Sequence, residues 1–321
     1  STVSKIDLAT DTVVATIPVG GPPYGVAINP AGTFAYVASD GGGVSKINLA
    51  TDTVVATIPV GSWSVGVAIN PAGTFAYVTN LMSGTVSKIN LATDTVVATI
   101  TVGGFPHDDV AINPAGTFAY VTNLMSSTVS KIDLATDTVV ATITVGGFPH
   151  DVAINPAGTF AYVANHVAGT VSKIDLATDT VVATITVGGM PGVVAINPAG
   201  TFAYVSSITD GTVSKIDLAT DTVVATIPVG ESPWGVALNP AGTFAYVANG
   251  GSGTVSKIPL GGVGPQSITF TSVGTQLLSA RTVALSATAS SSLAVAFTSA
   301  TPSVCTVSGS TVTLVTVGDC T

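Results

Sequence analysis

The stretch "NPAGTFAYV" at Asn29–Val37 decides the fold, because it recurs along most of the chain. Six copies begin at residues 29, 70, 113, 155, 197 and 239. The "NPAG" half predicts a tight turn, since proline presets φ and glycine accepts a positive φ. The "FAYV" half is a short apolar run after a turn, which is typical of a strand. The chain therefore repeats one turn and one strand six times.

The composition favours strands throughout the chain. Hydrophobic residues make up 46% of the sequence and charged residues only 8%, yet the apolar runs are short, such as "VVATI" and "GVAI". A membrane-spanning helix needs about 18 consecutive apolar residues, and no run approaches that length. Leu, Met, Glu and Lys at helical spacing are missing almost everywhere. We therefore expect an all-β chain with no membrane-spanning segment.

A second motif sets the repeat length. "VSKI" begins at residues 3, 44, 86, 129, 171, 213 and 255, so its spacing stays between 41 and 43 residues. A period near 42 in an all-β chain indicates a β-propeller whose blades have about four strands. Cut at its turns, the first full unit predicts strands A to D at residues 24–28, 34–38, 44–49 and 54–60.

The order of strands within a blade follows from proline. Strand D contains Pro18, Pro59 and Pro228 in three of its copies. Proline cannot donate to a ladder of hydrogen bonds, so we place strand D at the outer edge. Strand A is then innermost and lines the central channel. In the "LATDT" turn between strands C and D, we expect the Asp to bond the backbone just after it.

The number of blades depends on how the ends of the repeat meet. Strands A and B each occur six times, whereas "VSKI" occurs seven times. We predict six blades, the sixth taking its strand D from residues 13–19, with seven blades as the alternative. One strand C, at residues 3–8 or 255–260, is then surplus.

Four short motifs carry a family resemblance. Tyr77–Asn80 and Tyr120–Asn123 spell "YVTN", and "YVAN" begins at Tyr162 and Tyr246. From residue 1 to about 260 the chain resembles the YVTN family of β-propeller repeats, found in bacterial and archaeal surface and secreted proteins. The resemblance implies a fold, but propellers serve unrelated activities, so function has to be argued from the site.

The repeat ends near residue 260, and the sequence changes character. We predict a propeller over residues 1–261 and an Ig-like β module over 262–321, which is short for such a sandwich and apparently truncated. Ser, Thr, Gly and Asn dominate the surface chemistry, which favours an extracellular or cell-envelope protein. In that compartment a small module gains from a disulfide, so we expect Cys305 to pair with Cys320.

The charge pattern argues against nucleic acid as a partner. The net charge is −9, and seven of the eight basic residues are lysines of the repeated "VSKI" motif, which leaves no basic stripe. These lysines could form an anion-binding ring, but we favour aliphatic stems packed between blades with paired or solvated heads. They are Lys5, Lys46, Lys88, Lys131, Lys173, Lys215 and Lys257.

Histidines and aspartates open strand A in two neighbouring blades. The first blade has His107, Asp108 and Asp109, and the next has His150 and Asp151. Side by side at the channel mouth, they could ligate a divalent metal through His107, Asp108, His150 and Asp151. We favour a polar rim without a metal, and so predict no cofactor. His166 falls in a loop between strands B and C, where we expect it to be solvent-exposed and without partners.

Variation between the repeats is confined to one end of the blades. The A–B turn "NPAGT" is identical in six units, and "LATDT" recurs unchanged, whereas every B–C and D–A loop differs. Loops on a rigid scaffold commonly bind partners, although unconstrained loops also drift. This face carries acidic side chains at Asp40, Asp108, Asp109, Asp151, Asp210 and Glu231. Its candidate binding residues are Tyr24, Trp63, Phe105, His107, Phe148, His150 and Trp234.

The predicted function is that of an extracellular interaction or structural protein. One face of the propeller would bind a protein, a glycan or cell-surface matrix, or a further copy of the chain. The alternative is a propeller enzyme, such as a lactonase-like hydrolase with a metal at the channel mouth. We favour binding, because the innermost strands offer Val, Ala and Ile, which cannot carry out acid–base chemistry.

Overall fold

The computed structural model describes residues 1–41, 43–260, 268–270, 275–289 and 297–319. Two compact units divide the chain, Ser1–Leu260 and Gly261–Thr321, against a predicted boundary after residue 261. The elements of the described residues are strands joined by turns, apart from 3₁₀ turns at Leu124–Ser126 and Leu278–Ala280. Among them, no helix is long and apolar enough to span a membrane.

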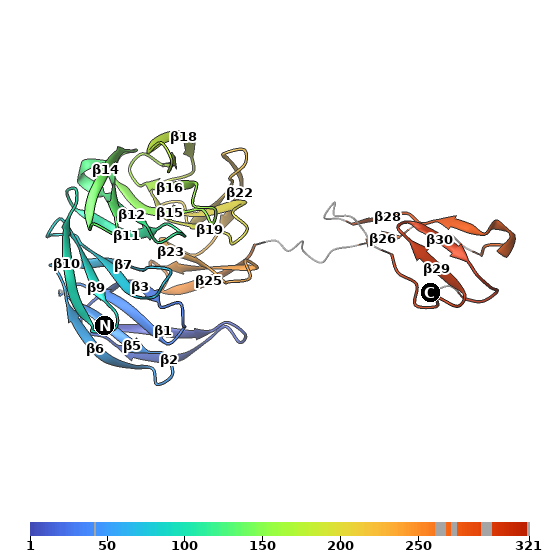
Figure 1. Ribbon diagram of the computed structural model, residues 1–321, viewed down its shortest axis with the longest axis horizontal. Coiled ribbons are helices and arrows are strands. Elements are labelled where there is room, and N and C mark those ends of the chain that lie inside the picture. The colour runs from blue at the N-terminus through green and yellow to red at the C-terminus, as the bar shows by residue number, and fades with distance from the viewer. Residues whose placement is uncertain (42, 261–267, 271–274, 290–296, 320–321) are drawn as a thin grey trace. The chain divides into compact units, whose positions relative to one another are not determined.

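Five complete blades form most of the first unit (Figure 1). The first blade contains β3 (Pro23–Ile28), β4 (Phe34–Ser39), β5 (Gly43–Asn48) and β6 (Thr53–Pro59). The others are β7 (Ser64–Ile69), β8 (Phe75–Asn80), β9 (Thr85–Asn90) and β10 (Thr95–Thr101); β11 (Pro106–Ile112), β12 (Phe118–Asn123), β13 (Thr128–Asp133) and β14 (Thr138–Thr144); β15 (Pro149–Ile154), β16 (Phe160–Asn165), β17 (Thr170–Asp175) and β18 (Thr180–Thr186); and β19 (Pro191–Ile196), β20 (Phe202–Ser207), β21 (Thr212–Asp217) and β22 (Thr222–Pro228). The predicted all-β propeller fold is therefore confirmed.

Each blade is an antiparallel meander whose first strand is innermost. In every complete blade the four strands pair in chain order, so the fourth strand has a free outer edge. The first strands of successive blades contact one another around the centre. Pro59 and Pro228 end outer strands and are exposed, because an edge position requires no ladder donor from them. The predicted order from strand A inside to strand D outside is confirmed.

Side chains close both turns of each unit. The Asn29 carboxamide oxygen accepts hydrogen bonds from the backbone N–H groups of Thr33 and Phe34, both at 2.9 Å, and Gly32 has a φ of 65°. In the C–D turn, Asp133 accepts from the backbone N–H of Ala135 at 2.8 Å. The hydrogen bond to the turn backbone is thus made by the aspartate that ends strand C, whereas we predicted it for the later aspartate, within "ATDT". That prediction was wrong, because the "ATDT" aspartate contacts a neighbouring blade.

The ring closes differently from the six-blade prediction. β1 (Thr2–Asp7) and β2 (Thr12–Pro18) form a two-stranded sheet of their own. At the other end of the repeat, β23 (Pro233–Leu238), β24 (Phe244–Asn249) and β25 (Thr254–Pro259) form a three-stranded sheet. β2 therefore does not complete that sheet, and the predicted strand exchange was wrong. A tight turn joins β2 to β1, so their pairing costs little chain entropy.

Two ion pairs show where the hairpin β1–β2 lies. Lys257 Nζ of the three-stranded blade is 2.9 Å from an Asp11 carboxylate oxygen in the hairpin turn. Lys5 Nζ of the hairpin is 2.8 Å from Asp52 Oδ1 in the first complete blade. The hairpin thus occupies a ring position between these two blades. The described residues thus fill seven positions of the ring and supply six inner strands, since β1 and β2 correspond to strands C and D.

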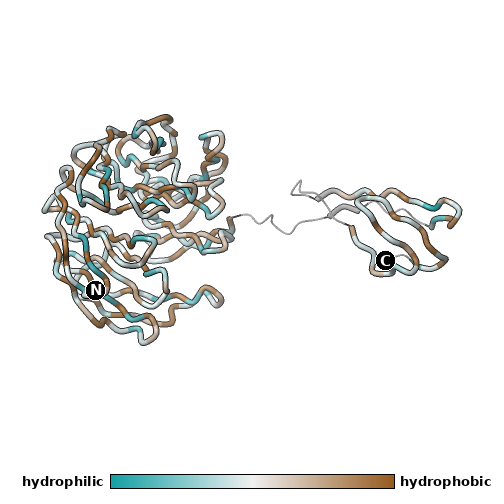
Figure 2. The backbone as a smooth tube through the Cα atoms, in the orientation of Figure 1, coloured by the Kyte–Doolittle hydropathy of each residue, from teal (hydrophilic) through white to brown (hydrophobic). Residues whose placement is uncertain are grey.

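The hydrophobic core is divided among the interfaces between blades. Tyr162 and Val171 of one blade pack on Val194 and Ile216 of the next, and all four are at most 4% exposed. Equivalent residues form the neighbouring clusters. In Figure 2 hydrophobic segments recur throughout this unit, separated by short hydrophilic ones. The same hydrophobic interface between neighbouring blades therefore recurs around the ring and stabilises it.

The repeated lysines lie in these interfaces rather than forming an anion-binding ring. Lys131 Nζ is 2.8 Å from Asp179 in the turn of the next blade and 4.6 Å from the centre of the Phe118 ring. Burial alone would lower the pKa of Lys46, but the hydrogen bond and charge attraction of Asp94 and the interactions with Tyr36 together outweigh burial, so the pKa of Lys46 is raised. The pairs are Lys5–Asp52, Lys46–Asp94, Lys88–Asp137, Lys131–Asp179, Lys173–Asp221 and Lys257–Asp11.

We expect Lys131→Met to lower the free energy of unfolding by about 1–2 kcal/mol, because it removes an ion pair and a cation–π contact. The Lys131 side chain is only 10% exposed, so water screens the pair weakly. Lys5→Met is the control: this side chain is 40% exposed, and we expect a loss below about 0.5 kcal/mol. Urea unfolding of both variants measures the difference. Equal losses would contradict the importance of burial.

The second unit contains two small sheets. β26 (Ile268–Phe270) pairs with β28 (Ala287–Ala289), while β30 (Thr311–Leu314) pairs with both β27 (Thr282–Ala284) and β29 (Cys305–Ser308). Cys305 is fully buried and disulfide-bonded. Its predicted partner, Cys320, lies outside the described residues. The Ig-like character of this unit stays a prediction.

Candidate functional site

Two sets of loops meet at one end of the propeller, which we call the loop face. It consists of the D–A loops (residues 19–22, 60–63, 102–105, 145–148, 187–190 and 229–232) and the B–C loops (40–41, 81–84, 124–127, 166–169, 208–211 and 250–253). Backbone hydrogen bonds join the two sets, as from Leu81 N–H to the Trp63 carbonyl at 2.9 Å. The variable loops therefore form one connected surface.

The D–A loops present large side chains from an unfavourable backbone conformation. We call Trp63, Phe105, Phe148 and Met190 the crown; each is the residue before the inner strand, with a φ between 51° and 56°. A non-glycine residue in this left-handed region costs about 1 kcal/mol or more. Their side chains are nevertheless 38–43% exposed. The fold thus holds four bulky apolar groups in water at a position that glycine would occupy more easily.

The asparagine of the "YVTN"-type motif supports three of the four crown residues, Trp63, Phe105 and Phe148, from below. Asn165 is fully buried, and its side-chain nitrogen donates to the hydroxyls of Thr170 and Ser172 at 3.1 and 2.9 Å. Gly146 packs directly on it, because a Cβ there would lie 2.5 Å from the Asn165 side chain. Asn80 and Asn123 do the same beneath Trp63 and Phe105. In the loop of Met190, Gly188 packs on Ser207 and Asp210 instead. This support keeps the D–A loop in one conformation.

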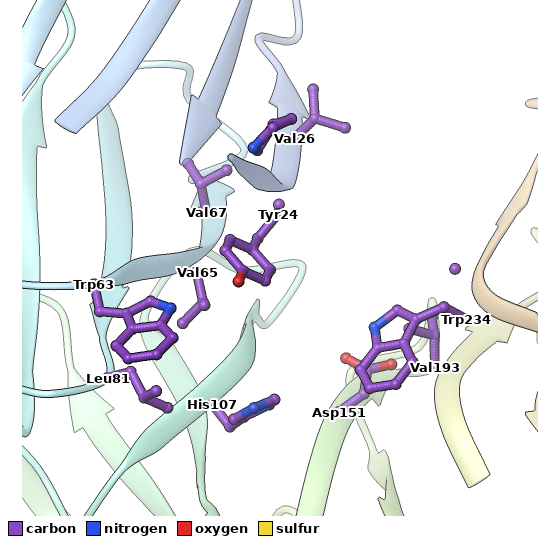
Figure 3. Close-up of a pocket in the computed structure, with 13 residues that line it drawn as sticks. Tyr24, Val26, Trp63, Val65, Val67, Leu81, His107, Asp151, Val193 and Trp234 are labelled. Atoms are coloured by element: carbon purple, nitrogen blue, oxygen red, sulfur yellow. The ribbon is translucent and has the colours of Figure 1, made fainter. Parts of the chain in front are cut away.

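A pocket of about 590 Å³ opens at the centre of the loop face. It takes at least one lining residue from each of the six inner strands, so it is the mouth of the central channel. Figure 3 shows the rings of Tyr24 and Trp63 on one side and Trp234 on the other. The apolar part of the wall consists of Val26, Val65, Val67, Leu81 and Val193.

The three histidines of the chain gather beside this pocket. The ring centres of His107 and His150 are 4.3 Å apart, and His166 lies 4.3 Å from His150 on the other side. The indole of Trp234 meets the His150 ring edge-on at 5.4 Å. The expectation that His166 is exposed and without partners was wrong, because its ring packs on His150 and its Nδ1 lies 3.2 Å from the carbonyl oxygen of Pro191 in the next blade.

Asp151 is buried beneath the pocket. One of its carboxylate oxygens accepts a 2.6 Å hydrogen bond from the Val194 backbone N–H of the next blade. Among the side chains that the structure describes, no group of three or more His, Cys, Asp or Glu could hold a metal ion. The side chains of Asp108 and Asp109 lie outside that set. His107, His150 and Asp151, whose side chains are described, therefore do not form a three-ligand metal site.

The predicted binding residues separate into two groups. Tyr24, Trp63, His107 and Trp234 line the pocket, whereas Phe105 and Phe148 stand around it in the crown. His150 is 6% exposed and lies against the other histidines. The sequence did not point to Met190, nor to the contact of His166 with His150. Met190 could have been found, because it precedes a proline just as Phe105 and Phe148 do.

Two family profiles match parts of the propeller. Residues 157–241 match the family described as "YNCE-like beta-propeller". Residues 66–184 match "Lactonase, 7-bladed beta-propeller". No curated protein matches the chain.

Solved structures share the fold at low sequence identity. An uncharacterised protein from Desulfotomaculum acetoxidans is 18% identical, with a TM-score of 0.70 over 80% of this chain and 88% of its own. A chain of hydrazine synthase from Kuenenia stuttgartiensis is 21% identical, with a TM-score of 0.55 over 74% of this chain and 95% of its own. Together with the observed sheets, these matches identify residues 1–260 as a β-propeller built from sequence repeats, similar to YNCE-like and lactonase-type propellers.

Proposed function

We propose that this chain is an extracellular interaction protein that binds a partner at the loop face. The observation that carries the proposal is the crown, in which four large apolar side chains stand exposed on left-handed backbone around a central pocket. Backbone strain of this kind persists where the surrounding structure enforces it, and it is common at binding sites. An asparagine beneath the loops of Trp63, Phe105 and Phe148, and Ser207 beneath the loop of Met190, pack on a loop glycine and supply that enforcement.

Rigid aromatic anchors suit a binding surface. Trp and Tyr often dominate interface energetics, since they bury a large area and lose little conformational freedom. Because the crown is already held in place, a partner would pay little ordering entropy at these loops. The identical turns at the opposite end of the propeller offer no comparable group of side chains.

The lining of the pocket favours a protein segment as the partner. Its wall contains four valines and a leucine, which cannot hydrogen-bond the hydroxyls of a sugar. An apolar or aromatic side chain fits such a wall, and acidic residues such as Glu231 on the same face favour basic neighbours in the ligand. We therefore propose a peptide segment with apolar and basic residues rather than a glycan.

A double variant tests this proposal. We expect the full chain to enrich basic, apolar sequences from phage-displayed random peptides, and Trp63→Ala with Phe148→Ala to weaken the selected peptides by at least about tenfold. Ala157→Glu, an exposed site in an "NPAGT" turn at the other end, is the control and should bind like the parent. Failure to enrich any peptide, unchanged binding by the double variant, or binding to a glycan array instead would overturn the proposal.

The match to the lactonase propeller profile favours hydrolysis of a lactone as a second candidate. His107 and Asp151 line the pocket and would be its acid–base or metal-binding groups. Hydrolysis of a simple lactone that depends on an added divalent metal and is lost in His107→Ala would support the enzyme. No hydrolysis above the uncatalysed rate would leave the binding proposal as the better account.

A further inference from the structure

Both tryptophans of the chain line one pocket. The sequence contains two, Trp63 and Trp234, and each belongs to the wall of the central pocket on the loop face. They come from different blades, because Trp63 directly precedes β7 and Trp234 lies on β23. Figure 3 shows their indole rings on opposite sides of the opening. The largest aromatic side chains of the chain are therefore gathered around a single cavity.

The two indoles are accessible to a ligand in this pocket. Trp63 is 38% exposed and Trp234 is 40% exposed. The backbone of Trp63 has a φ of 56°, so the loop holds this side chain out from an unfavourable conformation. An indole presents a negative π face to whatever lies above it. The pocket therefore offers aromatic faces from two directions.

Cation–π contacts recur throughout the propeller, but neither indole takes part in one. In six blades a lysine lies over a Phe ring, with its Nζ 4.0–4.7 Å from the ring centre. Within the part of the chain that the structure describes, no lysine or arginine lies over Trp63 or Trp234. Trp attracts cations more strongly than Phe or Tyr. The strongest cation acceptors of the propeller thus face the pocket and not a lysine of the chain.

The charge around the pocket also favours a cation. The D–A and B–C loops of the loop face contain no lysine or arginine, whereas Asp40, Asp210 and Glu231 lie in them. Asp151 is the acidic side chain of the pocket wall and is 2% exposed. A buried carboxylate interacts with a nearby charge more strongly than a carboxylate in water. Where histidine is uncharged, the opening is therefore a region of negative potential.

The wall discriminates between kinds of cation. Val65, Val67, Leu81 and Val193 supply apolar surface and no hydrogen-bond acceptor from their side chains. A primary ammonium has three N–H donors, which lose their water on entering such a pocket and need new acceptors. A quaternary ammonium has no donor to satisfy, and its methyl groups suit an apolar wall. It combines the positive charge that the indoles attract with the apolar surface that the valines require.

We propose that the central pocket binds a quaternary ammonium group. Trp63 and Trp234 would contact its methyl groups, which carry much of the positive charge, and Asp151 would contribute the opposing charge. The volume of about 590 Å³ has room for this group and for the chain that carries it. The proposal rests on binding at the loop face and names the group that enters the pocket. Choline-type small molecules and trimethylated lysine side chains share this chemistry.

Three small molecules with the same hydroxyethyl end test the chemistry. Choline carries a quaternary ammonium, ethanolamine carries a primary ammonium, and in the third alcohol an uncharged tert-butyl group replaces the trimethylammonium. We expect choline to bind the full chain about tenfold more tightly than either analogue, because only choline gains cation–π contacts without desolvating N–H donors. Titrations at about pH 8, where histidine is normally uncharged, use the fluorescence of the two tryptophans. Ligand-observed NMR measures the weaker affinities.

A substitution of one indole tests the cation–π contact. Trp234→Leu keeps an apolar side chain, so we expect the affinity for choline to fall about fivefold while that for the tert-butyl alcohol stays the same. Trp234→Phe keeps a weaker aromatic face and should lie between the two. The ratio of the two affinities is the readout, since a general loosening of the pocket would weaken both ligands. Ala157→Glu, in an exposed turn at the other end, is the control and should keep the parent ratio.

A pair of peptides distinguishes the two sources of the group. A peptide selected for the loop face is synthesised with lysine and with trimethyllysine at the same position. If the trimethyllysine form binds more tightly than both the lysine form and free choline, the group belongs to a protein partner. If trimethylation leaves the affinity unchanged while choline binds, the group belongs to a small molecule. Both results support the proposed chemistry of the pocket.

Four results would overturn the proposal: no choline binding, equal affinity for choline and the tert-butyl alcohol, tighter binding of ethanolamine, or an unchanged ratio in Trp234→Leu. Selected peptides that still depend on Trp63 and Phe148 would then leave the binding function of the loop face standing. Choline binding without enrichment of any peptide would instead support this pocket and overturn the peptide partner. The two proposals therefore fail separately.

Discussion

Tyr162→Ala is expected to lower the free energy of unfolding by about 3–5 kcal/mol, the largest effect of any single substitution considered for this chain. The ring is 1% exposed and packs against Val194, Ala203 and Val205 of the next blade. Removing it leaves a cavity at a rigid interface between sheets, where relaxation is limited. The thermal midpoint should fall on the order of 10 °C in calorimetry.

The same substitution at Tyr246 is the control. This tyrosine has the same place in its blade, but it borders a pocket beside the hairpin β1–β2 and is only half-buried. We expect Tyr246→Ala to cost about 1–2 kcal/mol, because less apolar area leaves contact. A loss as large as that of Tyr162→Ala would show that burial between blades is not the source of the stability.

Gly146→Ala is expected to destabilise the propeller by about 1–3 kcal/mol through overpacking. The added Cβ would lie 2.5 Å from the Asn165 carboxamide carbon, a distance that requires either the asparagine or the loop to move. Asn165 is fully buried and bonded to Thr170 and Ser172, so its displacement also weakens those hydrogen bonds. Urea unfolding measures the loss.

Gly147→Ala is the matched control in the next residue. A Cβ at Gly147 meets nothing within 4 Å, so we expect a change within about 0.5 kcal/mol. Phe148 should keep its position in this variant, so the affinity of peptides selected for the loop face should be unchanged. If Gly146→Ala is as harmless as Gly147→Ala, the asparagine does not support the crown in the way described.

Local chemistry explains why strands, turns and the order within each blade could be predicted. "NPAGT" closes its own turn through Asn29 and Gly32, within a few residues of each other. Proline on the outer strand is equally local, since it reflects a missing donor on one residue. Because the unit is repeated six times, the strands and turns predicted for one unit apply to its copies as well.

The number of ring positions was harder to predict, because it depends on which of two similar strands pairs with β2. β2 could pair with β1, a few residues away, or with β25 near the other end of the repeat. Both partners have nearly the same sequence, so side chains do not discriminate between them. The short loop decides, because closing a long loop costs more entropy than closing a tight turn.

Parts of the site escaped prediction because they join distant residues. Lys131 pairs with Asp179, 48 residues away, and not with the aspartate that ends its own strand. His166, in a B–C loop, contacts His150 on the inner strand of the same blade. The left-handed backbone of Trp63 was equally hidden, since that conformation usually signals glycine.

The sameness of the interfaces has a genetic consequence. At each interface, Tyr, Ala and Val of one blade pack against Val, Ala and Ile of the next. Because the same residues recur at successive interfaces, any unit is complementary to any other. Unequal recombination between two copies of the repeat would delete or duplicate one unit and join surfaces that already fit. The number of repeats can thus change in a single event, and each unit that is gained or lost takes its own variable loops with it.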